Sequence, residues 1–138
     1  MKSVEVVAAI IIKNGDIFAA QRGSGKHKDK WEFPGGKVEP GEKIEAALSR
    51  ELREELNIQV EPKKLLTTVN YSYPDFHLIM HCFLCRVVAG EINLLEHEDG
   101  KWLKERELDS LDWLPPDIEA VNKLKEFLKT QENSCSFY

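Results

Sequence analysis

Hydrophobic and polar residues recur along the chain with two periods, one typical of strands and one typical of helices. Runs of apolar and β-branched residues bounded by turn residues predict strands. These runs are 4–12, 16–22, 64–73, 77–88 and 101–104. Apolar residues at helical spacing predict two helices, one from about residue 42 to residue 57 and one over residues 117–129. We therefore expect a protein of the α/β class, with a mixed sheet between two helices in an α/β/α sandwich.

The length and composition are typical of one globular domain. With 138 residues, of which 42% are hydrophobic, the chain can bury one sizeable core. We expect a single domain over residues 1–130 and a frayed tail over residues 131–138, which show no periodicity. The apolar N-terminal run is shorter than the ~20 residues of a membrane span. No small-residue cleavage site follows it, so we expect a cytoplasmic protein that does not enter a membrane.

The net charge limits the partners that the surface can attract. At −5, it argues against binding of a nucleic-acid polymer or an acidic membrane, because such surfaces cluster Lys and Arg. An anionic small molecule would have to be met locally, by a metal ion and a few basic side chains. We expect the protein to be a monomer or a homodimer.

The cysteines are expected to be structural. Their number is three, and an odd number indicates reduced thiols. Cys82 and Cys85 form a C-x-x-C pattern, which can bind metal or carry redox chemistry. Both lie in a predicted strand, however, where residues three apart point to opposite faces. We therefore expect no metal or redox pair at this position.

The first predicted helix becomes acidic halfway along its inward face. Its apolar stripe contains Ala47 and Leu48 and continues into Glu51, Glu54 and Glu55. A half-buried carboxylate without a partner costs several kcal/mol, on the order of the transfer cost of a polar group. A cation is therefore expected beside these side chains, and Mg²⁺ or Mn²⁺ prefers such oxygen ligands. The alternative is a solvated acidic face on a surface helix.

The segment from Gly36 to Ile58 resembles the signature of the Nudix hydrolases. That signature is Gly, five residues, Glu, seven residues, and then Arg-Glu-apolar-X-Glu-Glu-X-Gly-apolar. The matching residues are Gly36, Glu42, Arg50, Glu51, Leu52, Glu54, Glu55 and Ile58. Asn57 stands where the family has Gly, and Asn also adopts the left-handed conformation that ends a helix. The resemblance implies the Nudix fold over nearly the whole chain.

The resemblance also implies a metal site. Glu51, Glu54 and Glu55 would hold Mg²⁺ or Mn²⁺, with the carbonyl oxygen of Gly35 as a further ligand. Arg50 and Glu42 are eight residues apart, so they could form an ion pair only across the start of the helix. We favour a role for Arg50 in orienting the adjacent carboxylate of Glu51 through a bidentate fork. The simpler interpretation of Arg50 is a surface ion pair with Glu54, four residues further along the helix.

The general base is expected in the loop that precedes a Trp-containing strand. Some relatives use a glutamate there, and both Glu96 and Glu98 stand before Trp102 in this chain. We favour Glu96, because the Glu-His pair of the family appears here as Glu96-His97. Either residue could instead be a solvated carboxylate of the loop.

Beyond the signature, VEVVAAIII, AAQR and WEFPGGKVEPGE resemble the MutT and CTP pyrophosphohydrolase branch of the family. This branch cleaves nucleoside triphosphates to a monophosphate and pyrophosphate. The matching residues that would contact the substrate are Arg22, His27, Phe33 and Tyr73. Phe76 stands where MutT has Arg, so that polar contact is not expected.

Asp117 falls where MutT has a residue that reads the base, but it is also a good N-cap for the last helix. As an acceptor of hydrogen bonds it would suit the N4 amine of cytosine or the N7 hydrogen of 8-oxoguanine. We therefore expect hydrolysis of CTP-type nucleotides or of 8-oxo-dGTP, which would clean the nucleotide pool. The alternatives are hydrolysis of ADP-ribose or dinucleoside polyphosphates, and a non-catalytic domain that senses nucleotides.

Overall fold

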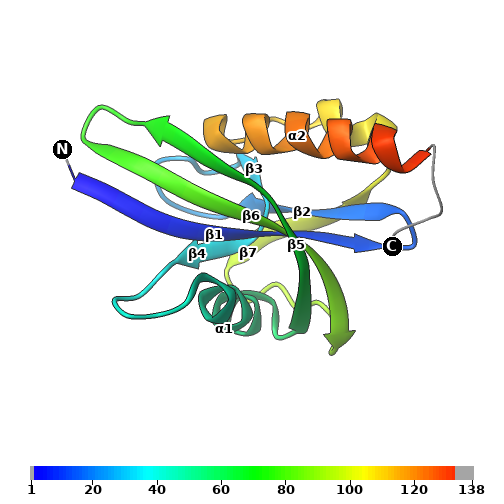
Figure 1. Ribbon diagram of the computed structural model, residues 1–138, viewed down its shortest axis with the longest axis horizontal. Coiled ribbons are helices and arrows are strands. Elements are labelled where there is room, and N and C mark those ends of the chain that lie inside the picture. The colour runs from blue at the N-terminus through cyan, green and yellow to red at the C-terminus, as the bar shows by residue number, and fades with distance from the viewer. Residues whose placement is uncertain (1, 133–138) are drawn as a thin grey trace.

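Seven strands and three helical segments make up residues 2–132, the part of the chain that the computed structural model describes (Figure 1). The strands are β1 (Lys2–Lys13), β2 (Asp16–Arg22), β3 (Trp31–Glu32), β4 (Gly35–Lys37), β5 (Gln59–Ser72), β6 (Phe76–Ala89) and β7 (His97–Leu103). The helical segments are α1 (Ile44–Leu56), the 3₁₀ helix η1 (Glu105–Ser110) and α2 (Pro115–Glu132). Among these residues, no helix is both long and apolar enough to cross a membrane.

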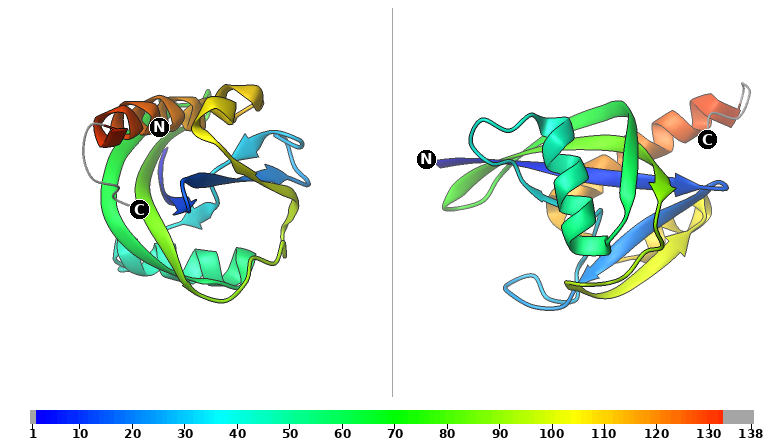
Figure 2. Two further views of the ribbon diagram at one scale, coloured as in Figure 1. Left: turned by 90° about the vertical axis from the view of Figure 1, so that its right-hand side faces the viewer. Right: turned by 90° about the horizontal axis from the view of Figure 1, so that it is seen from below.

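The strands form a mixed sheet that is organised around β1. This strand pairs in parallel with β6 and antiparallel with β4. It joins β2 through a tight turn at Asn14 and Gly15, whose positive φ angles of 53° and 83° are those of a two-residue hairpin. β5 pairs with β6 on one side, while β3 and β7 pair with β2 on the other. Helices α1 and α2 cover opposite faces (Figure 2), which confirms the expected α/β/α sandwich.

The core has two halves because β1 is buried on both faces. Its side chains alternate between the α2 side and the α1 side, as the pleat of a strand requires. The residues on the α2 side are Ala8, Ile10 and Ile12, and those on the α1 side are Val7, Ala9 and Ile11. Burial of each isoleucine stabilises the fold by about 1.5–3 kcal/mol. The continuous apolar run in the sequence is therefore typical of a strand that no solvent reaches.

Helix α1 packs the expected side chains but begins later than predicted. Leu48, Leu52 and Leu56 are fully buried against the sheet. Asn57 ends the helix in the left-handed conformation, with φ 56° and ψ 41°, which confirms that Asn replaces Gly there. The helix begins at Ile44 because Glu42 belongs to the preceding turn, where its carboxylate accepts a hydrogen bond from the Glu39 amide at 3.0 Å.

Several elements differ from the sequence prediction. β3 and β4 have only two and three residues, too few for a periodic pattern, and η1 was not predicted either. β7 begins at His97 rather than at residue 101. α2 extends from Pro115 to Glu132, so residues 131 and 132 are helical, whereas a frayed tail was expected from residue 131. The rest of that expected tail, residues 133–138, lies outside the described residues.

Cys82 and Cys85 lie on opposite faces of β6, as predicted. Cys82 belongs to the core half under α2 and Cys85 to the half under α1, and both are fully buried free thiols. Burial raises the pKa of the Cys85 thiol to about 12 and also raises the pKa of Cys82 well above its ordinary value. Neither side chain is available to a reagent in the folded protein.

We expect neither buried thiol to react in native protein at pH 8, because the reactive species is the thiolate. The measurement is reaction with Ellman's reagent in a Cys135→Ser background, so that only Cys82 and Cys85 report. Both thiols should react within minutes in guanidinium chloride, which serves as the positive control. Rapid reaction of either thiol without denaturant would contradict the burial described above.

Candidate active site

Two glycines of β4, Gly35 and Gly36, lie close against β1 and against a side chain of helix α1. A side chain at Gly35 would put its Cβ 1.9 Å from the carbonyl oxygen of Val7. A Cβ at Gly36 would lie 2.4 Å from the carboxyl group of Glu51. Gly35 therefore requires glycine, since the atoms it meets are backbone and cannot yield. At Gly36 the Glu51 carboxylate occupies the space, so any larger residue would displace that side chain. The sequence predicts a glycine loop here, and the structure shows what the two glycines contact.

An acidic cluster lies where α1 meets this loop. Glu55 is buried, and its Oε1 accepts a hydrogen bond from the Gly35 amide at 2.9 Å. Burial, followed by the charges of Glu32, Glu51 and Glu96, raises the pKa of Glu55 to about 9. Burial also raises the pKa of Glu51, although Arg50 opposes the shift. Several carboxylates are thus gathered in a region of low dielectric constant, where they repel one another.

The donor chemistry of this cluster fits a hard divalent cation such as Mg²⁺ or Mn²⁺. Carboxylate oxygens are the ligands such ions prefer, and a positive charge would relieve the repulsion that raises the pKa of Glu55. Within residues 2–132, no three His, Cys, Asp or Glu side chains already surround one ion-sized point. Glu51 is hydrogen-bonded to Arg50 and Glu55 to the Gly35 amide, while Glu54 is largely exposed.

Arg50 holds the acidic cluster together, but its guanidinium group forms the bidentate contact with Glu42 and not with Glu51, the partner we favoured. Its Nε and Nη2 donate to the two oxygens of Glu42 at 2.8 and 2.9 Å. Its Nη1 donates to Glu51 at 2.9 Å and to Glu54 at 3.3 Å, and Nη2 also reaches the carbonyl oxygen of Lys37. The bidentate partner is Glu42 because this residue precedes the helix and its side chain lies across the first turns. The expected pair with Glu54 is also present.

We expect Arg50→Lys to lower the turnover of the hydrolysis that the sequence predicts about tenfold, which is about 1.4 kcal/mol in the activation barrier. Lysine keeps the charge but cannot hold Glu42, Glu51 and the Lys37 carbonyl oxygen together, because it lacks the planar fork. Steady-state kinetics and a thermal melt would measure the effect. Arg53→Lys is the control, since Arg53 is exposed on the same helix. Equal turnover of the two variants would show that the fork does not matter.

A bulge in β2 and β7 separates the two candidate bases. Gln21 pairs with Asp99 but the next residue, Arg22, pairs with His97, so Glu98 is the extra residue of the bulge. Its carboxylate lies 3.6 Å from Lys28 Nζ, in the loop that connects β2 to β3. Glu98 therefore forms an ion pair away from the acidic cluster.

Glu96, in contrast, lies beside the acidic cluster. The preceding residue, Leu95, donates its amide to the carbonyl oxygen of Glu55 at 3.1 Å, which fixes the loop to the end of α1. The charge of Glu96 contributes to the raised pKa of both Glu51 and Glu55. Of the two glutamates considered from the sequence, the structure brings only Glu96 to the cluster.

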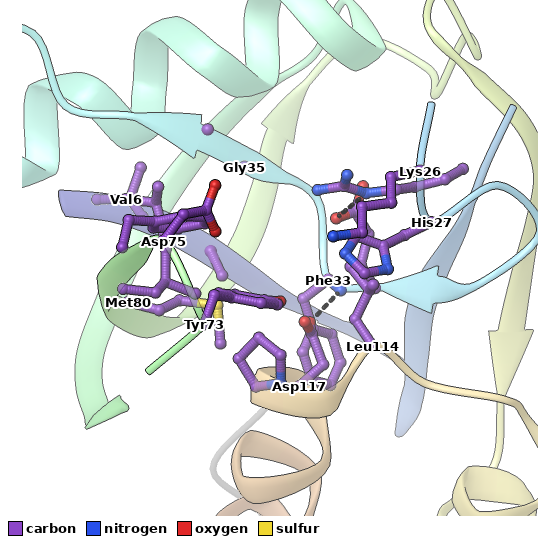
Figure 3. A pocket seen from close by; sticks show the side chains of 18 residues that line it. Val6, Lys26, His27, Phe33, Gly35, Tyr73, Asp75, Met80, Leu114 and Asp117 are labelled. Atoms are coloured by element: carbon purple, nitrogen blue, oxygen red, sulfur yellow. Dashed lines mark hydrogen bonds and ion pairs between the residues drawn. The ribbon is translucent and has the colours of Figure 1, made fainter. Parts of the chain in front are cut away.

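A cavity of about 320 Å³ opens next to this cluster and is lined in part by the two glycines of the loop. It contains all of the side chains predicted to contact the substrate. These are Arg22, His27, Phe33, Tyr73 and Asp117. Figure 3 shows Tyr73 on one side of the cavity, His27 and Lys26 on the other, and Asp117 between them at the start of α2. One space thus joins residues from five different elements and loops.

One wall of the cavity is aromatic. The Tyr73 ring stacks on Phe76 with the centroids 4.8 Å apart, and Tyr71 meets Tyr73 edge-on at 4.9 Å. His27 faces Tyr73 from the opposite side, with 6.0 Å between the two ring centroids. Partial burial and the neighbouring cations, Arg22 first, lower the pKa of His27. This wall offers a flat apolar surface on which a planar ring can stack.

Asp117 is fully buried and does not cap helix α2, which was the alternative to its reading of the base. Helix α2 begins at Pro115, so Asp117 is its third residue and not its N-cap. Its Oδ1 accepts a hydrogen bond from the Phe33 amide at 2.9 Å (Figure 3). Burial, and then the charge of Glu32, raise the pKa of Asp117 to about 8. This shift favours the protonated form, which can donate as well as accept, whereas an acceptor alone was expected.

Two further residues of the site were not predicted from the sequence. Glu32 lines the cavity, and its oxygens accept hydrogen bonds from Arg22 Nε at 3.1 Å and His97 Nε2 at 3.0 Å. The only sequence signal was a glutamate between two aromatic residues, Trp31 and Phe33, in an otherwise apolar stretch. His97 gave no signal of its own beyond its position next to Glu96.

Comparison with known proteins places this arrangement in a family. The NUDIX domain matches residues 2–130, and the chain belongs to the Nudix family. The 8-oxo-dGTP diphosphatase of Escherichia coli (strain K12) is 35% identical over 127 residues, which cover 91% of this chain and 98% of that protein. The CTP pyrophosphohydrolase of the same strain is 36% identical over 119 residues, covering 86% and 88%. The solution structure of the E. coli ORF135 protein superimposes with a TM-score of 0.84 at 32% identity, over 97% of this chain and 96% of that one.

Proposed function

We propose that the protein hydrolyses nucleoside triphosphates to a monophosphate and pyrophosphate, with a divalent metal ion, and acts on CTP-type nucleotides or 8-oxo-dGTP. The observation that carries this proposal is the continuity of the acidic cluster with a cavity that has an aromatic wall and a buried Asp117. The relatives named for 8-oxo-dGTP and CTP support the same two substrates. The protein would hydrolyse these nucleotides in the cytoplasmic nucleotide pool.

The lining of the cavity gives each part of a nucleotide a complementary surface. The base would stack on the wall made by Tyr73 and Phe76, with its polar edge toward Asp117. The phosphates would run toward Gly35, because the acidic cluster lies beyond it, and Arg22 would meet a negatively charged oxygen. A partly protonated Asp117 can pair with a base edge that presents a donor next to an acceptor, as both cytosine and 8-oxoguanine do.

The acidic cluster would supply the chemistry. Glu51, Glu54 and Glu55 would hold Mg²⁺ or Mn²⁺ together with the carbonyl oxygen of Gly35. When bound, such an ion neutralises phosphate charge and makes a water molecule more acidic. Glu96 would accept a proton from the attacking water, whose oxygen bonds to one phosphorus of the chain as the P–O bond that bridges the α- and β-phosphorus atoms breaks, so that a monophosphate and pyrophosphate are formed. Arg50 keeps Glu51 and Glu42 in place and does not touch the substrate.

A panel of nucleotides tests this proposal. Purified protein with Mg²⁺ is incubated with CTP, dCTP, 8-oxo-dGTP, dGTP, ADP-ribose and diadenosine tetraphosphate, and the products are separated by ion-exchange chromatography. We expect a monophosphate and pyrophosphate in equal amounts from CTP, dCTP or 8-oxo-dGTP, with the highest kcat/KM in that group. Turnover confined to ADP-ribose or diadenosine tetraphosphate would overturn the substrate assignment. Tight nucleotide binding with no turnover of any substrate would indicate a sensor instead.

A further inference from the structure

The loop that carries Glu96 is tied down on both sides of that residue. On one side, the amides of Asn93 and Leu95 donate to the carbonyl oxygens of Leu56 and Glu55 at 2.9 and 3.1 Å, at the end of α1. These backbone bonds fix the approach of the loop to the helix, and the pairing of His97 with Arg22 in the sheet holds the backbone where the chain leaves it. Glu96 itself is exposed, so burial does not fix its side chain.

On the other side of Glu96, the ring of His97 is buried and is held by one hydrogen bond. Its side chain is 4% exposed, and its Nε2–H donates to Glu32 Oε2 at 3.0 Å. The other ring nitrogen, Nδ1, is buried without a hydrogen-bond partner among the described residues. The orientation of the ring therefore depends on the bond to Glu32, which is stronger in a low dielectric than it would be in water.

Glu32 connects this loop to the cavity. Its second oxygen accepts from Arg22 Nε at 3.1 Å, and both Arg22 and Glu32 line the cavity. The bulge next to Arg22 is what turns His97 toward Glu32, because it shifts the pairing of β2 with β7 by one residue. A side chain that would contact the nucleotide and the loop that carries the candidate base thus share one half-buried carboxylate, that of Glu32.

We propose that His97 and Glu32 are positioning residues that hold Glu96 at the acidic cluster and link its position to the occupancy of the cavity at Arg22. This inference rests on the proposed hydrolysis, in which Glu96 accepts the proton. Neither residue touches the reacting atoms. Loss of the bond leaves that side of the loop held by strand pairing alone, so the fraction of molecules with Glu96 in place falls while the cavity keeps its shape.

The kinetic test compares three variants. We expect His97→Leu to lower kcat at least tenfold and to change KM less than twofold, because the cavity lining is retained. His97→Gln should recover most of kcat, since its amide nitrogen can donate to Glu32 from nearly the same point. His81→Leu is the matched control: His81 is also half-buried and paired with a glutamate, Glu5, at 2.7 Å, but lies away from the cavity. It should keep wild-type kcat.

Hydrogen exchange of the metal-free proteins provides a readout that does not depend on turnover. Amides of residues 93–98 should exchange faster in His97→Leu than in the wild type, and at the wild-type rate in His97→Gln and His81→Leu. Wild-type kcat in folded His97→Leu would overturn the proposal, as would a loss of kcat that Gln does not recover and that leaves exchange unchanged. If the wild type hydrolyses no nucleotide, the proposed function fails, while the exchange rates still decide whether His97 holds the loop.

Discussion

Glu55→Gln is expected to lower kcat at least a hundredfold at saturating Mg²⁺, which corresponds to about 2.7 kcal/mol in the barrier. Glutamine keeps the shape of the side chain, and its Oε1 can still accept the hydrogen bond from the Gly35 amide. It removes the negative charge that a divalent cation needs from a buried ligand. Pyrophosphate release at several Mg²⁺ concentrations would separate a loss of metal affinity from a loss of turnover.

The same substitution should leave the metal-free fold intact. Burial, followed by repulsion from Glu32, Glu51 and Glu96, raises the pKa of Glu55 to about 9, so a neutral amide resembles the group that the fold already contains at pH 7. Melting temperatures in EDTA should therefore be equal or slightly higher in the variant. Glu45→Gln is the control, because Glu45 is exposed on the same helix. Wild-type turnover of Glu55→Gln at limiting Mg²⁺ would exclude Glu55 as a metal ligand.

Asp117→Asn is expected to change which base the protein prefers. A good polar contact to a base edge contributes about 1–3 kcal/mol of discrimination, which is about 5- to 150-fold in a ratio of kcat/KM. The measurement is the ratio for CTP against 8-oxo-dGTP in the wild type, in Asp117→Asn and in Asp75→Asn. Asp75 lines the same cavity but is exposed, so its variant is the control. An unchanged ratio would mean that Asp117 only holds the Phe33 amide, which Asn can also do.

The stability of Asp117→Asn should also lose a dependence on pH. The pKa of Asp117 is about 8 in the folded protein and near 3.8 in the unfolded chain, so unfolding releases a proton between these values. The wild type is therefore stabilised most below pH 3.8 by this group, and that contribution is lost as the pH rises to 8. Each pH unit in the window costs at most about 1.4 kcal/mol. The free energies of unfolding of the two proteins, measured by denaturant melts at pH 5, 6.5 and 8, should differ most at pH 8 and converge as the pH falls to 5.

The sequence predicted most elements of the fold because its apolar periods are strong. The run in β1 and the leucines of α1 each pack as their spacing indicates. Elements of two or three residues, β3 and β4, have no period to detect. Their positions follow from pairing with β2 and β1, which is a property of the assembled sheet.

The candidate site was predictable where one helix carries its residues, and less so where distant segments meet. Glu51, Glu54 and Glu55 follow from the period of α1 alone. Glu32 and His97 are 65 residues apart in the chain and meet only through the pairing of β2 with both β3 and β7. The raised pKa of Asp117 likewise depends on burial beneath the loop, which no local pattern reports.

Two buried acids hold one short stretch of backbone from opposite layers of the molecule. Asp117 of α2 accepts a hydrogen bond from the amide of Phe33, and Glu55 of α1 accepts one from the amide of Gly35. Two residues of extended chain span about 7 Å. This stretch therefore fixes the distance between the part of the cavity that faces a base and the part that faces a phosphate chain. A ligand too short to reach from one end to the other could occupy either, but not present its phosphorus and its ring correctly at the same time.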